Sequence, residues 1–170
     1  MTGTGAFTSV SADRRFQVEV ADDNNALLAL SQLGDGKRSI ESDSPEEVEF
    51  AFPGGEEFRD DPSLGLGQDS VYEFDRDSNE SDQSNPTDGL LRIENQGVQS
   101  VEVYSTHQTD SELEIEIYDV TDDDETALRE SPVTLDIGEH VDTGFRIRTF
   151  DAAIGSFNET LRVVAEASDN

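Results

Sequence analysis

The side chains in this sequence that come closest to a known chemical pattern are the oxygen ligands of one polar stretch. They have the first three ligand spacings of a calcium-binding loop, and calcium takes carboxylate and amide oxygens as ligands. The candidate ligands are Asp75, Asp77, Asn79 and the nearby Asp82. However, Glu80 stands where such a loop needs a glycine for its sharp turn, and Pro86 stands where it needs a bidentate glutamate. The segment is therefore not an EF-hand, and calcium remains a candidate ligand.

A second acidic cluster offers the same type of ligand. It consists of Asp122, Asp123 and Asp124, followed by Glu125. In a chain this acidic, a run of carboxylates is usually a solvated surface, and aspartates also favour turns between strands. Both interpretations stay open for this cluster, a weak calcium site and a solvated turn.

Groups that could support catalysis are scarce. His107 and His140 are the only histidines, and neither forms a metal-ligand pair with a residue three or four positions away, so both are predicted to be surface side chains. The segment 65–67, Gly-Leu-Gly, lacks the third glycine of a dinucleotide-binding loop. The chain contains no cysteine and no Gly-x-Ser-x-Gly motif. The sequence therefore predicts a protein that is not an enzyme and needs no cofactor, calcium excepted.

Two asparagines match the acceptor pattern for glycosylation. Asn79 and Asn158 each begin an Asn-x-Ser/Thr triplet, whereas Asn85 is followed by a proline that blocks the modification. Both matching sites are predicted to lie in loops, which is where a secreted protein would carry sugars.

The charge of the chain excludes several classes of partner. Its 170 residues include 40 acidic and 11 basic side chains, for a formal net charge of -29, and Lys37 is the only lysine. A field this negative repels phosphate backbones and anionic lipids, and no apolar run approaches the roughly 18 residues of a membrane span. We therefore expect neither nucleic-acid binding nor membrane insertion of the mature chain. The same composition is typical of a protein that works in molar salt, where the screening length falls to about 3 Å.

The elements that must position these residues are short strands. Apolar and polar residues alternate in several segments bounded by turn residues, most clearly where Leu113, Ile115 and Ile117 alternate with glutamates. The segments predicted as strands are 16–20, 47–52, 71–74, 90–94, 101–106, 113–120, 133–139, 144–148 and 161–167, with 133–139 at a sheet edge. The apolar run 26–30 is either a buried strand or one helical turn. Residues 75–88 are too polar for a core and are predicted to form an exposed loop. The sequence predicts an all-β fold, an antiparallel β-sandwich or jelly roll of about eight strands, with residues 13–170 forming one domain.

The first twelve residues are predicted to form a separate strand segment. Residues 1–10 carry no charge, which is unusual in this chain and is typical of a mature N-terminus left after a leader peptide is removed. In an extended conformation Thr4, Ala6, Thr8 and Val10 share one face, and Phe7 lies on the other. Such a strand must pair its backbone groups with a sheet edge. The edge can belong to the same sandwich or to a neighbouring subunit, and both alternatives stay open.

Three segments carry a resemblance to known secreted proteins. Residues 3–8, Gly-Thr-Gly-Ala-Phe-Thr, and residues 133–139, Val-Thr-Leu-Asp-Ile-Gly-Glu, resemble a haloarchaeal family of secreted proteins of unknown function. More distantly, the N-terminal segment is similar to that of the TasA and camelysin group. Residues 91–97, Leu-Arg-Ile-Glu-Asn-Gln-Gly, are similar to the strand and Asn-x-Gly turn of secreted β-sandwich modules.

This resemblance implies assembly of the chain into a homopolymer. TasA-like subunits are jelly-roll domains that polymerise by donor-strand exchange, so the resemblance implies that the N-terminal segment of one subunit completes a sheet of the next. The implied interface residues are Thr4, Ala6, Phe7, Thr8 and Val10. The expected function is that of a structural subunit of an extracellular, pilus-like filament on a halophilic archaeon. The alternative is a monomeric secreted module that binds calcium or a glycan through its acidic loops.

Overall fold

The computed structural model describes residues 14–20, 28–33, 39–40, 47–52, 69–74, 89–108, 113–149 and 157–168. These residues form eleven strands and no helix, which confirms the all-β prediction. Within the described part of the chain, nothing resembles an apolar helix of membrane-spanning length. The segments 1–12 and 75–88, predicted to be a separate strand and a polar loop, lie outside the described residues.

The strands follow one another along the chain with short connections in the second half. They are β1 (Arg14–Val20), β2 (Leu28–Gln32), β3 (Ser39–Ile40), β4 (Glu47–Phe52), β5 (Val71–Phe74), β6 (Leu91–Asn95), β7 (Val101–Gln108), β8 (Glu114–Asp119), β9 (Val133–Leu135), β10 (His140–Arg148) and β11 (Phe157–Ala167). The described strands outnumber the eight or so that were predicted, and β3, only two residues long, matches none of the predicted segments. The predicted edge strand is confirmed as β9, which lies at the end of its sheet.

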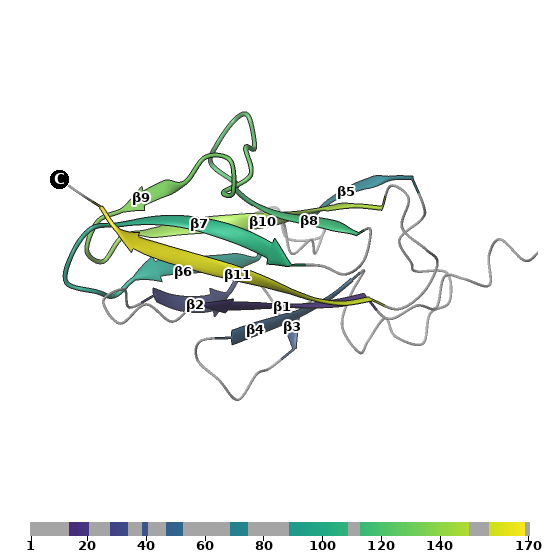
Figure 1. Cartoon of the computed structure of the whole chain (residues 1–170), viewed down its shortest axis with the longest axis horizontal. Helices are drawn as coiled ribbons and strands as arrows, with labels where there is room; N and C mark the ends of the chain where they lie inside the picture. The colour runs from purple at the N-terminus through teal and green to yellow at the C-terminus, as the bar shows by residue number, and fades with distance from the viewer. Residues whose placement is uncertain are drawn as a thin grey trace, which may run out of the picture.

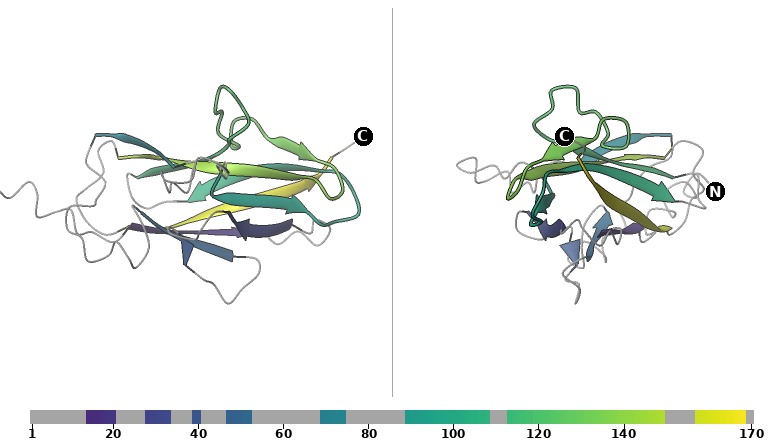
Figure 2. Two further views of the ribbon diagram at one scale, coloured as in Figure 1. Left: turned by 180° about the vertical axis from the view of Figure 1, so that it is seen from behind. Right: turned by 60° about the vertical axis from the view of Figure 1, so that its left-hand side comes forward.

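Two sheets face each other as the layers of a β-sandwich (Figure 1). Sheet A has the order β3-β4-β1-β11-β7-β9, and sheet B has the order β2-β6-β10-β5, with β8 also paired to β10. In sheet B, β5 and β6 pair with different halves of β10 along one side, and β8 pairs with the other side. The views in Figure 2 show the same two layers from behind and after a turn of 60° that brings the left-hand side of Figure 1 forward. The β-sandwich prediction is confirmed, and jelly-roll topology stays a prediction.

One strand pair departs from the antiparallel expectation. β1 runs parallel to β11, with Arg14 opposite Phe157 and Val20 opposite Val163, whereas the other described pairs are antiparallel. A parallel pair joins strands that are far apart in sequence, since it needs a long connection. Here the connection is almost the whole chain, so the first and last described strands lie side by side in the middle of sheet A.

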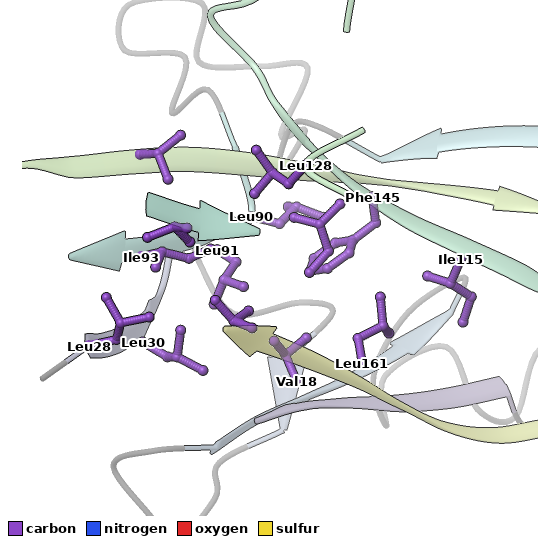
Figure 3. Packing of buried hydrophobic residues seen from close by; sticks show 14 of the residues in the cluster. Val18, Leu28, Leu30, Leu90, Leu91, Ile93, Ile115, Leu128, Phe145 and Leu161 are labelled. Atoms are coloured by element: carbon purple, nitrogen blue, oxygen red, sulfur yellow. The ribbon is translucent and has the colours of Figure 1, made fainter. Parts of the chain in front are cut away.

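The core lies between the sheets and follows the alternation of the strands. In β6, Leu91 and Ile93 are fully buried, while Arg92 between them and Glu94 after them are partly exposed. Figure 3 shows these two side chains pointing from sheet B toward Val18 and Leu161 of sheet A. Burial of each such side chain contributes about 1.5–3 kcal/mol. The sandwich is therefore held together mainly by apolar side chains from the inner faces of both sheets.

Gly144 in β10 is needed because a tyrosine lies directly over it. A Cβ atom at this position would be 2.8 Å from Cζ of Tyr118 and 3.0 Å from the backbone oxygen of Phe74. Tyr118 is fully buried and cannot swing away into solvent. We expect Gly144→Ala to lower the free energy of unfolding by about 1–3 kcal/mol through overpacking.

Chemical denaturation of the variant in molar potassium chloride measures this effect. Thr134→Ala, at an exposed position of β9, is the control and should change stability by less than about 0.5 kcal/mol. A Gly144→Ala variant as stable as the control would show that the contact with Tyr118 is not tight.

Candidate functional site

Most residues that the sequence singled out lie outside the described part of the chain. These are Thr4, Ala6, Phe7, Thr8, Val10, Asp75, Asp77, Asn79 and Asp82. The donor strand, the first calcium loop and one glycosylation site therefore stay predictions. Asp122, Asp123, Asp124, Asn158 and both histidines are described.

In the second acidic cluster, the carboxylate of Asp122 organises a turn. It accepts hydrogen bonds from the backbone N–H of Thr126 at 3.0 Å and of Asp124 at 3.1 Å. These two bonds favour the charged form and lower the pKa of Asp122. Asp123 and Asp124 are exposed, and no group of three or more histidine or acidic side chains among the described residues could hold a metal ion. The turn interpretation accounts for the contacts of Asp122, and calcium binding gains no support from them.

Asn158 lies within a strand, and the prediction of a loop there was wrong. β11 begins at Phe157 rather than at Leu161, and Asn158 is opposite Arg15 of β1. The apolar pattern begins only at Leu161. The preceding polar residues extend the strand because their backbone pairs with β1. Glycosylation of Asn158 stays a prediction.

His107 is buried, and the prediction of a surface position was wrong. Its side chain is 7% exposed, and that of Glu159 beside it is 8% exposed. β7 continues to Gln108, so His107 shares the inward face of the strand with the buried Val101 and Val103. The period-two pattern, continued beyond residue 106, would have identified this position. His140 is exposed, as predicted, and it is the first residue of β10.

The imidazole of His107 contacts two other strands. Its Nδ1 accepts a long hydrogen bond, 3.5 Å, from the backbone N–H of Ile115 in β8. Its Nε2 lies 3.6 Å from Oε2 of Glu159 in β11. Burial lowers the pKa of His107, and the nearby carboxylate of Glu159 opposes this shift only in part. The neutral imidazole can therefore hold its proton on Nε2, facing Glu159, while Nδ1 remains an acceptor.

A second buried carboxylate, Glu116, lies on the outer face of sheet B. It is 3% exposed and contacts the guanidinium groups of Arg129, Arg146 and Arg148. Arg146 also lies over the ring of Tyr118, with Cζ 5.0 Å from the ring centroid. Three of the chain's 11 basic residues thus gather around one acid. Arg129 belongs to the segment 120–132 between β8 and β9, so this cluster attaches that segment to the sheet.

Asn95 joins two turns at one end of the sandwich. Its Nδ2 donates to the backbone oxygens of Gln99 at 2.8 Å and Leu135 at 3.0 Å, and its Oδ1 accepts from the N–H of Gly97 at 2.9 Å. Its backbone oxygen accepts a hydrogen bond from Gly138. Turn 96–100 and turn 136–139 are therefore fixed to each other by one buried side chain.

The same end carries two exposed apolar side chains. Val98, in turn 96–100, is 88% exposed, and Ile137, in turn 136–139, is 62% exposed. Turn 96–100 has the sequence Gln-Gly-Val-Gln-Ser and no charge. We call the two turns the apolar end. Turn 96–100 is therefore an uncharged surface in an acidic chain, but the exposed Asp136 and Glu139 of turn 136–139 lie beside it, and Asp136 accepts a hydrogen bond from the hydroxyl of Ser100.

The first described strand, β1, begins with Arg14 at the opposite end of the sandwich. Because β1 and β11 are parallel, Arg14 lies beside Phe157, the first residue of β11. β11 then runs the length of the sheet, and Ser168 after it donates a hydrogen bond to Ser100 in turn 96–100. The C label in Figure 1 marks this end. Strand β1 thus begins at the end of the sandwich remote from the apolar end.

Comparison with known proteins finds no family description and no curated protein that matches this chain. Its function is therefore inferred from its own residues.

Proposed function

We propose that this protein is a structural subunit of an extracellular, pilus-like filament on the surface of a halophilic archaeon. Copies of the chain join head to tail, and the N-terminal segment of one subunit pairs with a sheet edge of the next. The subunit performs no catalysis, and its partner is a second copy of itself.

The observation that carries this proposal is the position of the two ends. The uncharged residues 1–10 precede a strand that starts at Arg14, and the apolar end is at the far side of the sandwich. A contact between two different surfaces of identical subunits does not close on itself, so repetition builds a fibre. Opposite placement of the two surfaces is what such a head-to-tail contact requires.

The open edge of sheet B supports an acceptor site near the apolar end. β2 is the outermost strand there and pairs only with β6 among the described strands. Leu28, at the start of β2, is opposite Asn95, so this edge begins where the apolar end begins. Unpaired backbone groups at a sheet edge can bind an extended segment by adding a strand. We assign the acceptor role to β2.

Charge supports the choice of these surfaces. With a net charge of -29, two copies repel each other strongly unless salt screens the carboxylates. In molar salt the screening length is about 3 Å, so only charges in direct contact still matter. Residues 1–10 and the acceptor strand β2 carry no charge, so their pairing brings no carboxylates of these two segments together.

Removal of residues 1–10 tests the proposal. We expect the truncated chain to remain folded and soluble in molar potassium chloride and to lose polymerisation completely, because the donor segment is gone. Circular dichroism reports the fold, and sedimentation reports the polymer. A peptide of residues 1–12 added to the full-length chain should shorten the polymers, because it occupies the acceptor edge.

A matched pair of charge substitutions tests whether assembly depends on residues 4–10 in particular or is disturbed by any charge added near the N-terminus. Phe7→Asp should abolish polymers, whereas Thr2→Asp, which adds the same charge outside residues 4–10, should preserve them. Normal polymerisation of the truncated chain or of Phe7→Asp would refute assembly through this segment.

A further inference from the structure

The two sheets are connected at one edge by a titratable side chain. β7 belongs to sheet A and β8 to sheet B, and His107 of β7 accepts the backbone N–H of Ile115 of β8. On its other side, β8 is paired with β10. The imidazole is therefore a polar link between the two sheets, as the side chain of Asn95 is between β6 and β9.

We propose that His107 is a pH-sensitive latch that holds β8 of sheet B against β7 of sheet A when it is neutral and releases β8 when it is protonated. The latch consists of His107, Glu159 and the N–H of Ile115. It is independent of polymerisation, and it acts within a single subunit.

The chemistry of the imidazole explains the release. In the neutral form one ring nitrogen donates and the other accepts, and Nδ1 is the acceptor here because it faces an N–H group. A protonated imidazole has a donor on both nitrogens and no acceptor. The proton on Nδ1 would then face the N–H of Ile115, whose side chain is buried, and this N–H would lose its partner. A buried donor without a partner is costly, so protonation favours separation of the two strands.

Burial, together with the charged groups around His107, sets which protonation form the closed state prefers. Glu159 faces it from β11 and Glu114 from β8, and both favour the protonated form. Arg129, from the segment after β8, opposes protonation. Burial has the largest effect and keeps the pKa below its usual value in the closed state. An exposed His107 regains an ordinary pKa near 6.5.

The sign of the pH dependence follows from this difference. The open state binds a proton more readily than the closed state. The closed state is therefore fully favoured above about pH 6.5, and its stability relative to the open state decreases as the pH falls toward the lowered pKa of His107. The equilibrium constant for opening should rise up to about tenfold between pH 7.5 and pH 5.5. Most carboxylates titrate below about pH 5, so this window isolates the histidines.

Hydrogen exchange of the Ile115 amide in the full-length chain measures the opening. The rates are recorded by NMR in molar potassium chloride at several pH values and corrected for the intrinsic pH dependence of exchange. In His107→Gln the side-chain oxygen can still accept the N–H but cannot titrate, so the rise in opening at low pH should disappear. His140→Gln removes the exposed histidine and should keep the rise.

A rise in opening that persists in His107→Gln, or that is lost in His140→Gln, would overturn the latch. If His107→Gln does not fold, titration of the unaltered protein decides instead. The ring resonances of His107 and the amide resonance of Ile115 should then change with the same midpoint. A ring that titrates while the Ile115 amide stays unchanged would overturn the proposal as well.

Discussion

Glu116→Gln is expected to lower the free energy of unfolding by about 3 kcal/mol, because it removes the one acid around which three arginines gather. Loss of one partner of a buried ion pair typically costs about 3–5 kcal/mol, since the other charge stays desolvated. We expect the lower end of that range. Arg129 and Arg148 are 35% and 36% exposed and can turn toward water, while Arg146, 13% exposed, keeps its ion pairs with Glu73 and Glu125.

Glu114→Gln is the matched control for this experiment. Glu114 shares Arg129 with Glu116, but its side chain is 38% exposed. An exposed ion pair contributes less than about 1 kcal/mol, so the control should unfold close to the unaltered protein. Chemical denaturation in molar potassium chloride compares the two variants. Equal losses in both would show that burial of Glu116 does not matter.

Asn95→Asp is expected to be the second large effect, a loss of about 3 kcal/mol. The substitution keeps the shape of the side chain and replaces the Nδ2 donor with a carboxylate oxygen. That oxygen would face the backbone oxygens of Gln99 and Leu135 in a buried site, where loss of a hydrogen bond and desolvation of a charge both cost free energy. The turns of the apolar end should then separate.

Gln96→Glu is the control for Asn95→Asp. It makes the same change of charge one residue later, at an exposed position of the same turn. Its effect should stay within about 0.5 kcal/mol, as is usual for surface substitutions. Thermal unfolding of both variants in molar salt gives the comparison. An Asn95→Asp variant as stable as Gln96→Glu would contradict the role of Asn95 in joining the turns.

The strands could be predicted because alternation is a local signal. Leu113, Ile115 and Ile117 alternate with glutamates, and Ile115 and Ile117 lie in β8 with their side chains in the core. The parallel pairing of β1 with β11 could not be predicted in this way. Which strand pairs with which depends on contacts between residues that are far apart in sequence, and alternation contains no information about them.

The same distinction between local and long-range signals applies to two buried polar side chains, His107 and Glu116. The inward position of His107 could be predicted, because the alternation that buries Val101 and Val103 continues to residue 107. The burial of Glu116 could not be predicted, because alternation assigns it to the solvent side of β8, and it is buried by contact with Arg129 from a segment that folds back over that face. Long-range packing of this type leaves no periodic signal in the sequence.

Head-to-tail assembly is tested most directly by negative-stain microscopy of the purified full-length chain in molar potassium chloride, with size-exclusion chromatography of the same sample. High salt removes the repulsion between acidic subunits, so assembly is not prevented by charge. We predict periodic fibres and material that elutes ahead of the monomer. A single monomer peak and grids without fibres would contradict the filament and would favour a monomeric binding module instead.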